Sequence, residues 1–172
     1  MKNGIYEENG YKAWYREGAL HREDGPAIEW HDGSKAWLLN NEYHREDGPA
    51  KEMSDGYKAW YTNGKLHREN GPAVEHKCGY KAWYINDELH RENGPAIVWA
   101  DGPRAWYVHG VQKTEAQLYD LYPSHTTALP RTEAEPPKRT ESAFRSISRI
   151  VANMLHLRSK DSTPTDTKKP SV

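Results

Sequence analysis

The chain has 172 residues, a formal net charge of −1 and a hydrophobic content of 35%. This length allows one modest domain with additional segments, and the near-neutral charge argues against a protein that binds nucleic acid by its overall charge. The single cysteine, Cys78, excludes an intrachain disulfide framework. No run approaches the ~18 apolar residues of a membrane span, and the N-terminus lacks the apolar stretch of a secretory signal, so we expect a cytoplasmic protein.

A 23-residue repeat runs from about residue 4 to residue 112. The motif His-Arg-Glu-(Asp/Asn)-Gly-Pro-Ala begins at His21, His44, His67 and His90. The motif Lys-Ala-Trp, with Arg in place of Lys in its last copy, ends at Trp14, Trp37, Trp60, Trp83 and Trp106. Self-similarity at a fixed period is typical of an array in which small units shield one another's apolar surface.

The turn chemistry predicts that each unit is a β-meander. Asp-Gly and Asn-Gly between short β-prone runs are strong hairpin signals, because both residues tolerate positive φ, and Gly-Pro turns the chain again. For the second unit we expect strands over 27–30, 35–39 and 43–45, with turns at 32–33, 40–41 and 46–49.

Alternation along the central strand of a unit predicts its two faces. In the third unit we expect Tyr57, Ala59 and Tyr61 on one face and Lys58 and Trp60 on the other. Because both faces then carry aromatic side chains, a single hairpin cannot cover its own apolar surface, and stacked units are needed.

These residues resemble MORN repeats, including the degenerate arrays of bacteria and viruses. The period matches, and so does the order Tyr-x-small-x-aromatic-x-x-Gly-x-x-His over 57–67. Ala59 and Arg68 stand where the family usually has glycine, so lipid binding described for some members is not carried over. The resemblance implies an all-β repeat array, an elongated and twisted antiparallel sheet used for attachment between proteins.

The cluster His21-Arg22-Glu23-Asp24 invites a catalytic or metal-binding interpretation. The same cluster occurs four times, whereas an active site needs one distinct constellation. Equivalent histidines are expected about 10–15 Å apart, too far to share a zinc ion. We therefore expect no enzyme, no metal and no cofactor, and instead expect His to pack on an aromatic ring and Arg to pair with Glu along the array.

The repeated tryptophans have two interpretations. The first is that they form the core of thin units, since Trp buries a large area. The second is an aromatic platform for a glycan or a peptide. Four lysines are expected to share the Trp face, in cation–π contact or packed along the rings: Lys12, Lys35, Lys58 and Lys81.

Three positions depart from the repeat: Lys51, Met53 and Cys78 replace residues that are apolar, Trp and Asp in other units. Variation at aligned sites is where an array would encode the choice of partner, although drift explains it equally. Lys51 and Met53 are therefore candidate binding residues.

Beyond the array, residues 114–117 have the form of a capping box, which predicts a short helix that seals the last hairpin and ends at Pro123. The array with this helix is expected to span residues 1–122, followed by a Pro-rich linker over 123–138, an amphipathic basic helix over 139–159 and a disordered tail over 160–172. Residues 1–110 hold 14 basic and 18 acidic residues, whereas residues 111–172 hold 10 and 7.

The predicted amphipathic helix supplies the other candidate binding residues: Phe144, Arg145, Ile147, Arg149, Val151 and Met154. Three interpretations stay open: the helix packs on the sheet or self-associates, it docks on another protein, or it lies on a membrane surface. The sequence thus favours a non-enzymatic scaffold, adaptor or inhibitor that binds an unidentified protein. The alternative is a module that holds a glycan or peptide on its Trp and Lys face.

Overall fold

A computed structural model describes residues 1–8 and 10–123, in which every paired strand is antiparallel. The strands are β1 (Gly4–Glu8), β2 (Tyr11–Arg16), β3 (Ala19–Leu20), β4 (Ile28–Trp30), β5 (Lys35–Ala36), β6 (Leu38–Leu39), β7 (Glu42–Tyr43), β8 (Lys51–Glu52), β9 (Tyr57–Ala59), β10 (Tyr61–Thr62), β11 (Lys65–Leu66), β12 (Val74–His76), β13 (Lys81–Ala82), β14 (Tyr84–Ile85), β15 (Glu88–Leu89), β16 (Ile97–Val98), β17 (Arg104–Val108) and β18 (Val111–Lys113). One helix, α1 (Glu115–Leu121), follows them.

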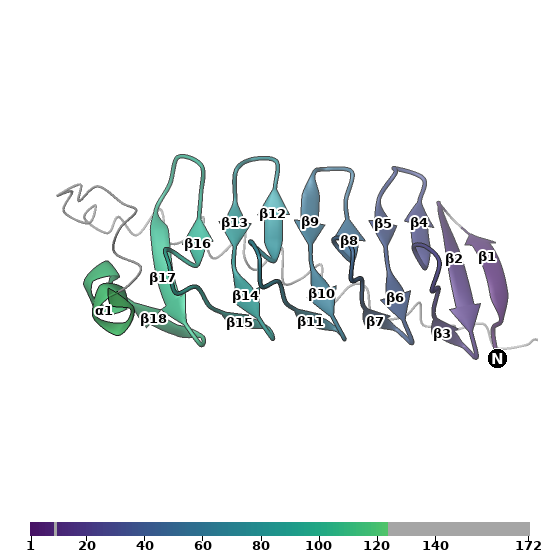
Figure 1. Ribbon diagram of the computed structural model, residues 1–172. Coiled ribbons are helices and arrows are strands. Elements are labelled where there is room, and N and C mark those ends of the chain that lie inside the picture. Colours follow the sequence, from purple (N-terminus) through teal and green to yellow (C-terminus); the bar gives the residue numbers. More distant parts are fainter. Residues whose placement is uncertain (9, 124–172) are drawn as a thin grey trace, which may run out of the picture. The chain divides into compact units, whose positions relative to one another are not determined.

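The hairpins stand side by side, from β1 at one end to β18 and α1 at the other (Figure 1). The long sheet has the order β1-β2-β4-β5-β8-β9-β12-β13-β16-β17-β18, with β3 paired to β2. Three two-stranded ladders, β6-β7, β10-β11 and β14-β15, form a second row below it in the view of Figure 1. The expected antiparallel repeat array is therefore confirmed over the described residues.

The central strand of a unit changes its pairing partner at the tryptophan. We expected one strand over 35–39, but β5 ends at Ala36 and β6 begins at Leu38. The Trp37 N–H donates to the Ala50 carbonyl at 2.8 Å, and the Trp37 carbonyl accepts from the His44 N–H at 3.1 Å. The first half of the strand thus pairs within the long sheet, and the second half pairs within its own hairpin.

Two kinds of turn join the strands. The turn at Asn63-Gly64 has φ of 49° and 75°, and two consecutive residues with positive φ are what a type I′ hairpin turn requires. At the opposite edge, Gly56 (φ 90°) follows Asp55, whose Oδ1 accepts from the Tyr57 N–H at 2.9 Å. The hairpin turns of the other units also have two consecutive positive φ angles, for example at Asn40-Asn41 and Asn86-Asp87. This geometry explains why residues that tolerate positive φ recur there, and why Asp-Gly recurs at the opposite edge.

Hydrogen bonds link each unit to the next. The Arg45 N–H donates to the Tyr61 carbonyl at 3.3 Å, and the Gly64 N–H donates to the Tyr43 carbonyl at 2.9 Å. The Asn63 N–H donates to Nδ1 of His44 at 3.2 Å. Because such contacts recur at the other junctions, neighbouring units stabilise one another, as expected for a linear array.

Alanine, rather than tryptophan, fills the closest contacts of the sheet. Eight alanines have no exposed surface: Ala13, Ala27, Ala36, Ala50, Ala59, Ala73, Ala82 and Ala96. The repeated tryptophans are half-buried and none is among the buried core residues, so the interpretation that they form the core is not confirmed. Small side chains are needed where the Gly-Pro-Ala segment brings its backbone against the central strand, as at Ala50 and Trp37.

The predicted capping helix is confirmed. The Gln117 N–H donates to the Thr114 hydroxyl at 3.2 Å, and the Thr114 N–H donates to the Gln117 side chain at 2.9 Å. Leu118 is 1% exposed, and burial of such a side chain contributes about 1.5–3 kcal/mol. The helix therefore covers apolar surface at the end of the array.

Candidate functional site

A guanidinium lies on a tryptophan ring in four successive units. The Arg carbon Cζ is 3.8–4.1 Å from the centre of the ring in the pairs Arg22–Trp14, Arg45–Trp37, Arg68–Trp60 and Arg91–Trp83. Trp14 lies in β2, and the other three tryptophans each lie at the break between two consecutive strands of a unit. Each Arg lies in the loop that follows the hairpin. We call the surface formed by these eight residues and by Lys12, Lys35, Lys58 and Lys81 the Trp–Arg face.

The expected cation–π partner of the tryptophans is therefore corrected from lysine to arginine. Lys58 lies in β9 and Trp60 is the second residue after Lys58, so the two side chains share a face but extend in parallel. Arg68 reaches the same ring because the type I′ turn at Asn63-Gly64 brings the chain back across it. The sequence signal was present, since Arg follows Trp by eight residues in all four units.

Each arginine is also held by hydrogen bonds. Nη1 of Arg45 donates to the Pro49 carbonyl at 3.3 Å and to Oε1 of Glu52 at 3.1 Å, and Nε donates to Oδ1 of Asp47 at 2.8 Å. The Arg–Glu ion pair recurs at Arg22–Glu29 (3.6 Å) and Arg68–Glu75 (3.1 Å), which confirms the expected Arg–Glu pairing in three units. The guanidinium positions are thus fixed before any partner binds.

Charges alternate across the long sheet on the Trp–Arg face. In register from one strand to the next, the residues directly opposite one another are Glu7, Lys12, Glu29, Lys35, Glu52, Lys58, Glu75, Lys81, Val98 and Arg104. Opposite charges on facing residues stabilise a sheet. The alternation is interrupted once, at Val98.

The repeated histidines connect neighbouring units through hydrogen bonds, and the ring of His90 also packs on the ring of His109, with the ring centres 4.3 Å apart. Nδ1 of His21 accepts from the Asn40 N–H at 3.1 Å, and Nδ1 of His90 accepts from the His109 N–H at 3.3 Å. The other ring nitrogen, Nε2, lies 3.2 Å from Glu23 in the first unit. Both ring nitrogens of His21 therefore have structural partners.

Local contacts shift the pKa of several groups. The His21 and Arg16 side chains lower the pKa of Glu23, and Arg45 lowers the pKa of Asp47. On the other face of the sheet, burial together with neighbouring tyrosines raises the pKa of Tyr57 and Tyr80.

The three residues that depart from the repeat lie in different environments. Lys51 is only 8% exposed, and its Nζ is 5.5 Å from the centre of the Tyr43 ring. Met53 is half-buried. Cys78 is exposed and has a free thiol, and its backbone N–H donates to Nδ1 of His76 at 3.2 Å. The structure does not bring Lys51 and Met53 onto the Trp–Arg face. The candidate residues Phe144, Arg145, Ile147, Arg149, Val151 and Met154 lie outside the described residues.

Two further features concern residues 1–8 and 10–123 only. No group of three or more His, Cys, Asp or Glu side chains in this part of the chain is placed to hold a metal ion. The same part contains no helix with the length and apolar character needed to cross a membrane.

The chain was compared with family models, curated proteins and solved structures, and none of them matches it. The Trp–Arg face must therefore be interpreted from its own geometry.

Proposed function

We propose that this protein is a non-enzymatic, MORN-like scaffold that binds another protein through the Trp–Arg face and acts as an adaptor or inhibitor. The observation that carries the proposal is the fourfold repetition of one rigid Trp–Arg stack whose side chains are half-buried on the sheet surface. Trp and Arg are the side chains that most often dominate the binding energy of protein interfaces. Preorganised side chains also lose less conformational entropy when a partner binds.

The repetition supports binding over catalysis. The His and Arg side chains that could suggest chemistry are engaged in hydrogen bonds that hold neighbouring segments together, as for His44 and Arg45. A linear array of nearly equal units offers an extended surface, which is the usual basis of recognition by repeat proteins.

The same geometry weakens the glycan alternative. A sugar stacks on an open aromatic face, but a guanidinium already covers one face of the indole in four of the repeated tryptophans, at 3.8 Å in the Arg68–Trp60 pair. The proposed role of the C-terminal amphipathic helix as a second docking element rests on the sequence pattern of residues 139–159 alone.

Site-specific photo-cross-linking tests the proposal on the full chain. With p-benzoylphenylalanine in place of Lys58, which is exposed on the Trp–Arg face, we expect a discrete cross-linked protein in lysate of the source cell. The matched position is Lys65, which is exposed at the hairpin edge and should yield no such product. The captured protein is then purified and titrated by calorimetry against the Lys58→Glu and Lys65→Glu variants.

We expect Lys58→Glu to weaken this binding and Lys65→Glu to leave it unchanged. Equal cross-linking yields from the two positions would contradict recognition through the Trp–Arg face. An unchanged affinity of the purified partner for the Lys58→Glu variant would contradict it as well.

A further inference from the structure

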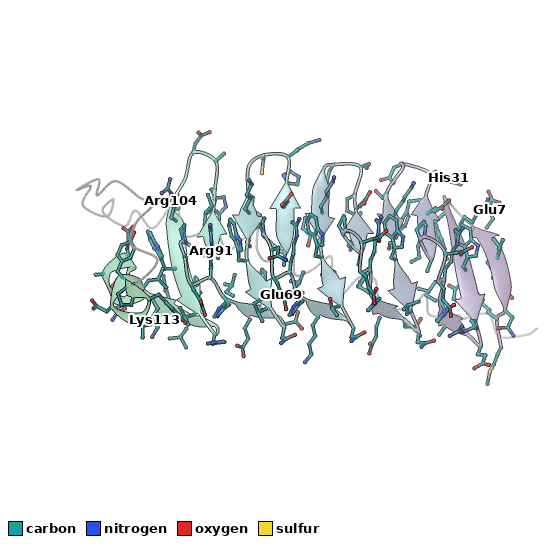
Figure 2. The ribbon with its side chains drawn as sticks, viewed as in Figure 1. Glu7, His31, Glu69, Arg91, Arg104 and Lys113 are labelled. Carbon is teal, nitrogen blue, oxygen red and sulfur yellow. The ribbon has the colours of Figure 1, made fainter. Side chains whose placement is uncertain are left out.

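The interruption of the charge ladder at Val98 leaves a cluster of positive charge. Val98 lies directly opposite Lys81 on one side and Arg104 on the other. In the preceding unit, Glu75 occupies the corresponding place between Lys58 and Lys81. Lys81 and Arg104 are exposed, and Arg104 lies at the opposite end of the sheet from Glu7 (Figure 2).

Arg91 completes this cluster. Like its equivalents it stacks on a tryptophan, Trp83, and its Nη1 donates to the Pro95 carbonyl at 3.1 Å. Its Nε donates to Asn93 at 3.0 Å, where the first two units have Asp. Among the described residues, no carboxylate forms an ion pair with Arg91, whereas the three preceding arginines each pair with a Glu.

Partial burial of Arg91 without such a carboxylate has an electrostatic consequence. Desolvation disfavours its charged form and lowers the pKa of the guanidinium. An external anion that approaches Val98 would restore the interaction that Glu75 supplies to Arg68 at 3.1 Å.

We infer that the surface around Val98 binds a carboxylate of an acidic peptide segment on the partner protein, with Arg91, Lys81 and Arg104 as its cationic contacts. This inference rests on the proposed function, and it names the chemical group that one part of the proposed interface binds. We call this surface the Val98 site.

The preceding units indicate why the ligand is a carboxylate. In each of these units a Glu occupies the position that is equivalent to Val98. Its carboxylate lies 3.1–3.6 Å from the guanidinium of the arginine that is equivalent to Arg91. The geometry of the Arg at the Val98 site is already fixed by Trp83 and Pro95, so little reorganisation is needed. The half-buried Val98 provides apolar surface for the stem of an acidic side chain.

The test uses the full chain and a fluorescein-labelled hexaglutamate peptide, followed by fluorescence anisotropy at low ionic strength. Val98→Glu restores the repeat pattern and should weaken binding at least about tenfold, the change expected for loss of one charge-assisted hydrogen bond. Thr62→Glu is the matched control, because it adds the same charge at an exposed strand position away from the Val98 site. Hexaglutamine serves as the control peptide.

A second variant tests the site by gain of function. Glu75→Val gives the third unit the same arrangement, with Arg68 in the place of Arg91, and should bind hexaglutamate more tightly than the unmodified chain. Glu42→Val removes an equal charge from an exposed position on β7 and should have a smaller effect. Circular dichroism of each variant verifies that it is folded.

Absence of saturable binding, equal weakening by Val98→Glu and Thr62→Glu, or equal strengthening by Glu75→Val and Glu42→Val would overturn the inference. Displacement of the peptide by inorganic phosphate at lower concentration than by glutarate would overturn the assignment of a carboxylate. The cross-linking experiment at Lys58 is independent of Val98, so the scaffold proposal can fail or survive separately.

Discussion

Arg68 lies on the indole ring of Trp60, with its Cζ 3.8 Å from the ring centre, and at the same time donates to the carboxylate of Glu75 at 3.1 Å. One loop residue thus joins the central strand of its own unit to the first strand of the next. This relationship explains why Arg and Trp keep the same spacing throughout the repeat.

Removal of this guanidinium should destabilise the array. Arg68→Ala loses the cation–π contact with Trp60 and the hydrogen bonds to Pro72 and Glu75. We expect the free energy of unfolding, measured by urea denaturation, to fall by about 2 kcal/mol. Lys65→Ala is the control at an exposed position and should change it little. Equal stability of the two variants would argue against a structural role for the stack.

A larger side chain in the alanine row should also destabilise the fold. Ala59 has no exposed surface and lies opposite Lys51 and Val74 in the sheet. Ala59→Leu should therefore cost about 1–3 kcal/mol through overpacking. Thr62→Leu makes a side chain of the same size at an exposed position and should cost much less. A lower midpoint of thermal unfolding for Thr62→Leu than for Ala59→Leu would contradict this packing.

The histidine contacts predict a rescue experiment. His44→Ala leaves the Asn63 N–H without its Nδ1 acceptor and should cost about 1 kcal/mol. His44→Asn places a side-chain oxygen near the position of Nδ1, so it should recover part of the loss. The exposed His31 provides the control variant His31→Ala. No recovery by Asn, with an equal loss at His31, would show that the contact does not stabilise the junction.

Acidic pH should weaken the first two units more than the last two. The arginines lower the pKa of Asp24 and Asp47. A carboxylate whose pKa is lowered by folding contributes stability above its unfolded pKa of about 4, and this contribution is lost as the pH falls through the folded value. Asn70 and Asn93, at the equivalent positions, do not titrate.

Asp47→Asn gives the second unit the asparagine of the later units. The variant should therefore lose less stability than the unmodified chain between pH 5 and pH 3, a range that extends about one unit on either side of the ordinary pKa of Asp. Urea midpoints measured across this range provide the comparison. A slope as steep as that of the unmodified chain would mean that Asp47 does not contribute. Asp55→Asn tests a turn carboxylate that has no arginine partner among the described residues.

Some structural features followed directly from local sequence. Asn63-Gly64 adopts two positive φ angles because these residues tolerate them, and the capping box at Thr114 forms from side chains three residues apart. The exposed Lys58 and the buried Ala59 follow the alternation of a strand. The sequence also shows that Val98 departs from the repeat, since Glu29, Glu52 and Glu75 precede it at intervals of 23 residues.

The sequence by itself determined the period, because the same motifs recur every 23 residues. It also determined the turns, the faces of the strands and the capping helix, because each of these depends on residues close together in the chain. Only the tertiary structure decided that Arg rather than Lys covers the indoles, that alanines rather than tryptophans fill the closest contacts, and that Val98 faces Lys81 and Arg104. The physical reason is that these contacts depend on register and on the path of the connecting loop. Both are set only when several units pack together and satisfy one another's hydrogen bonds.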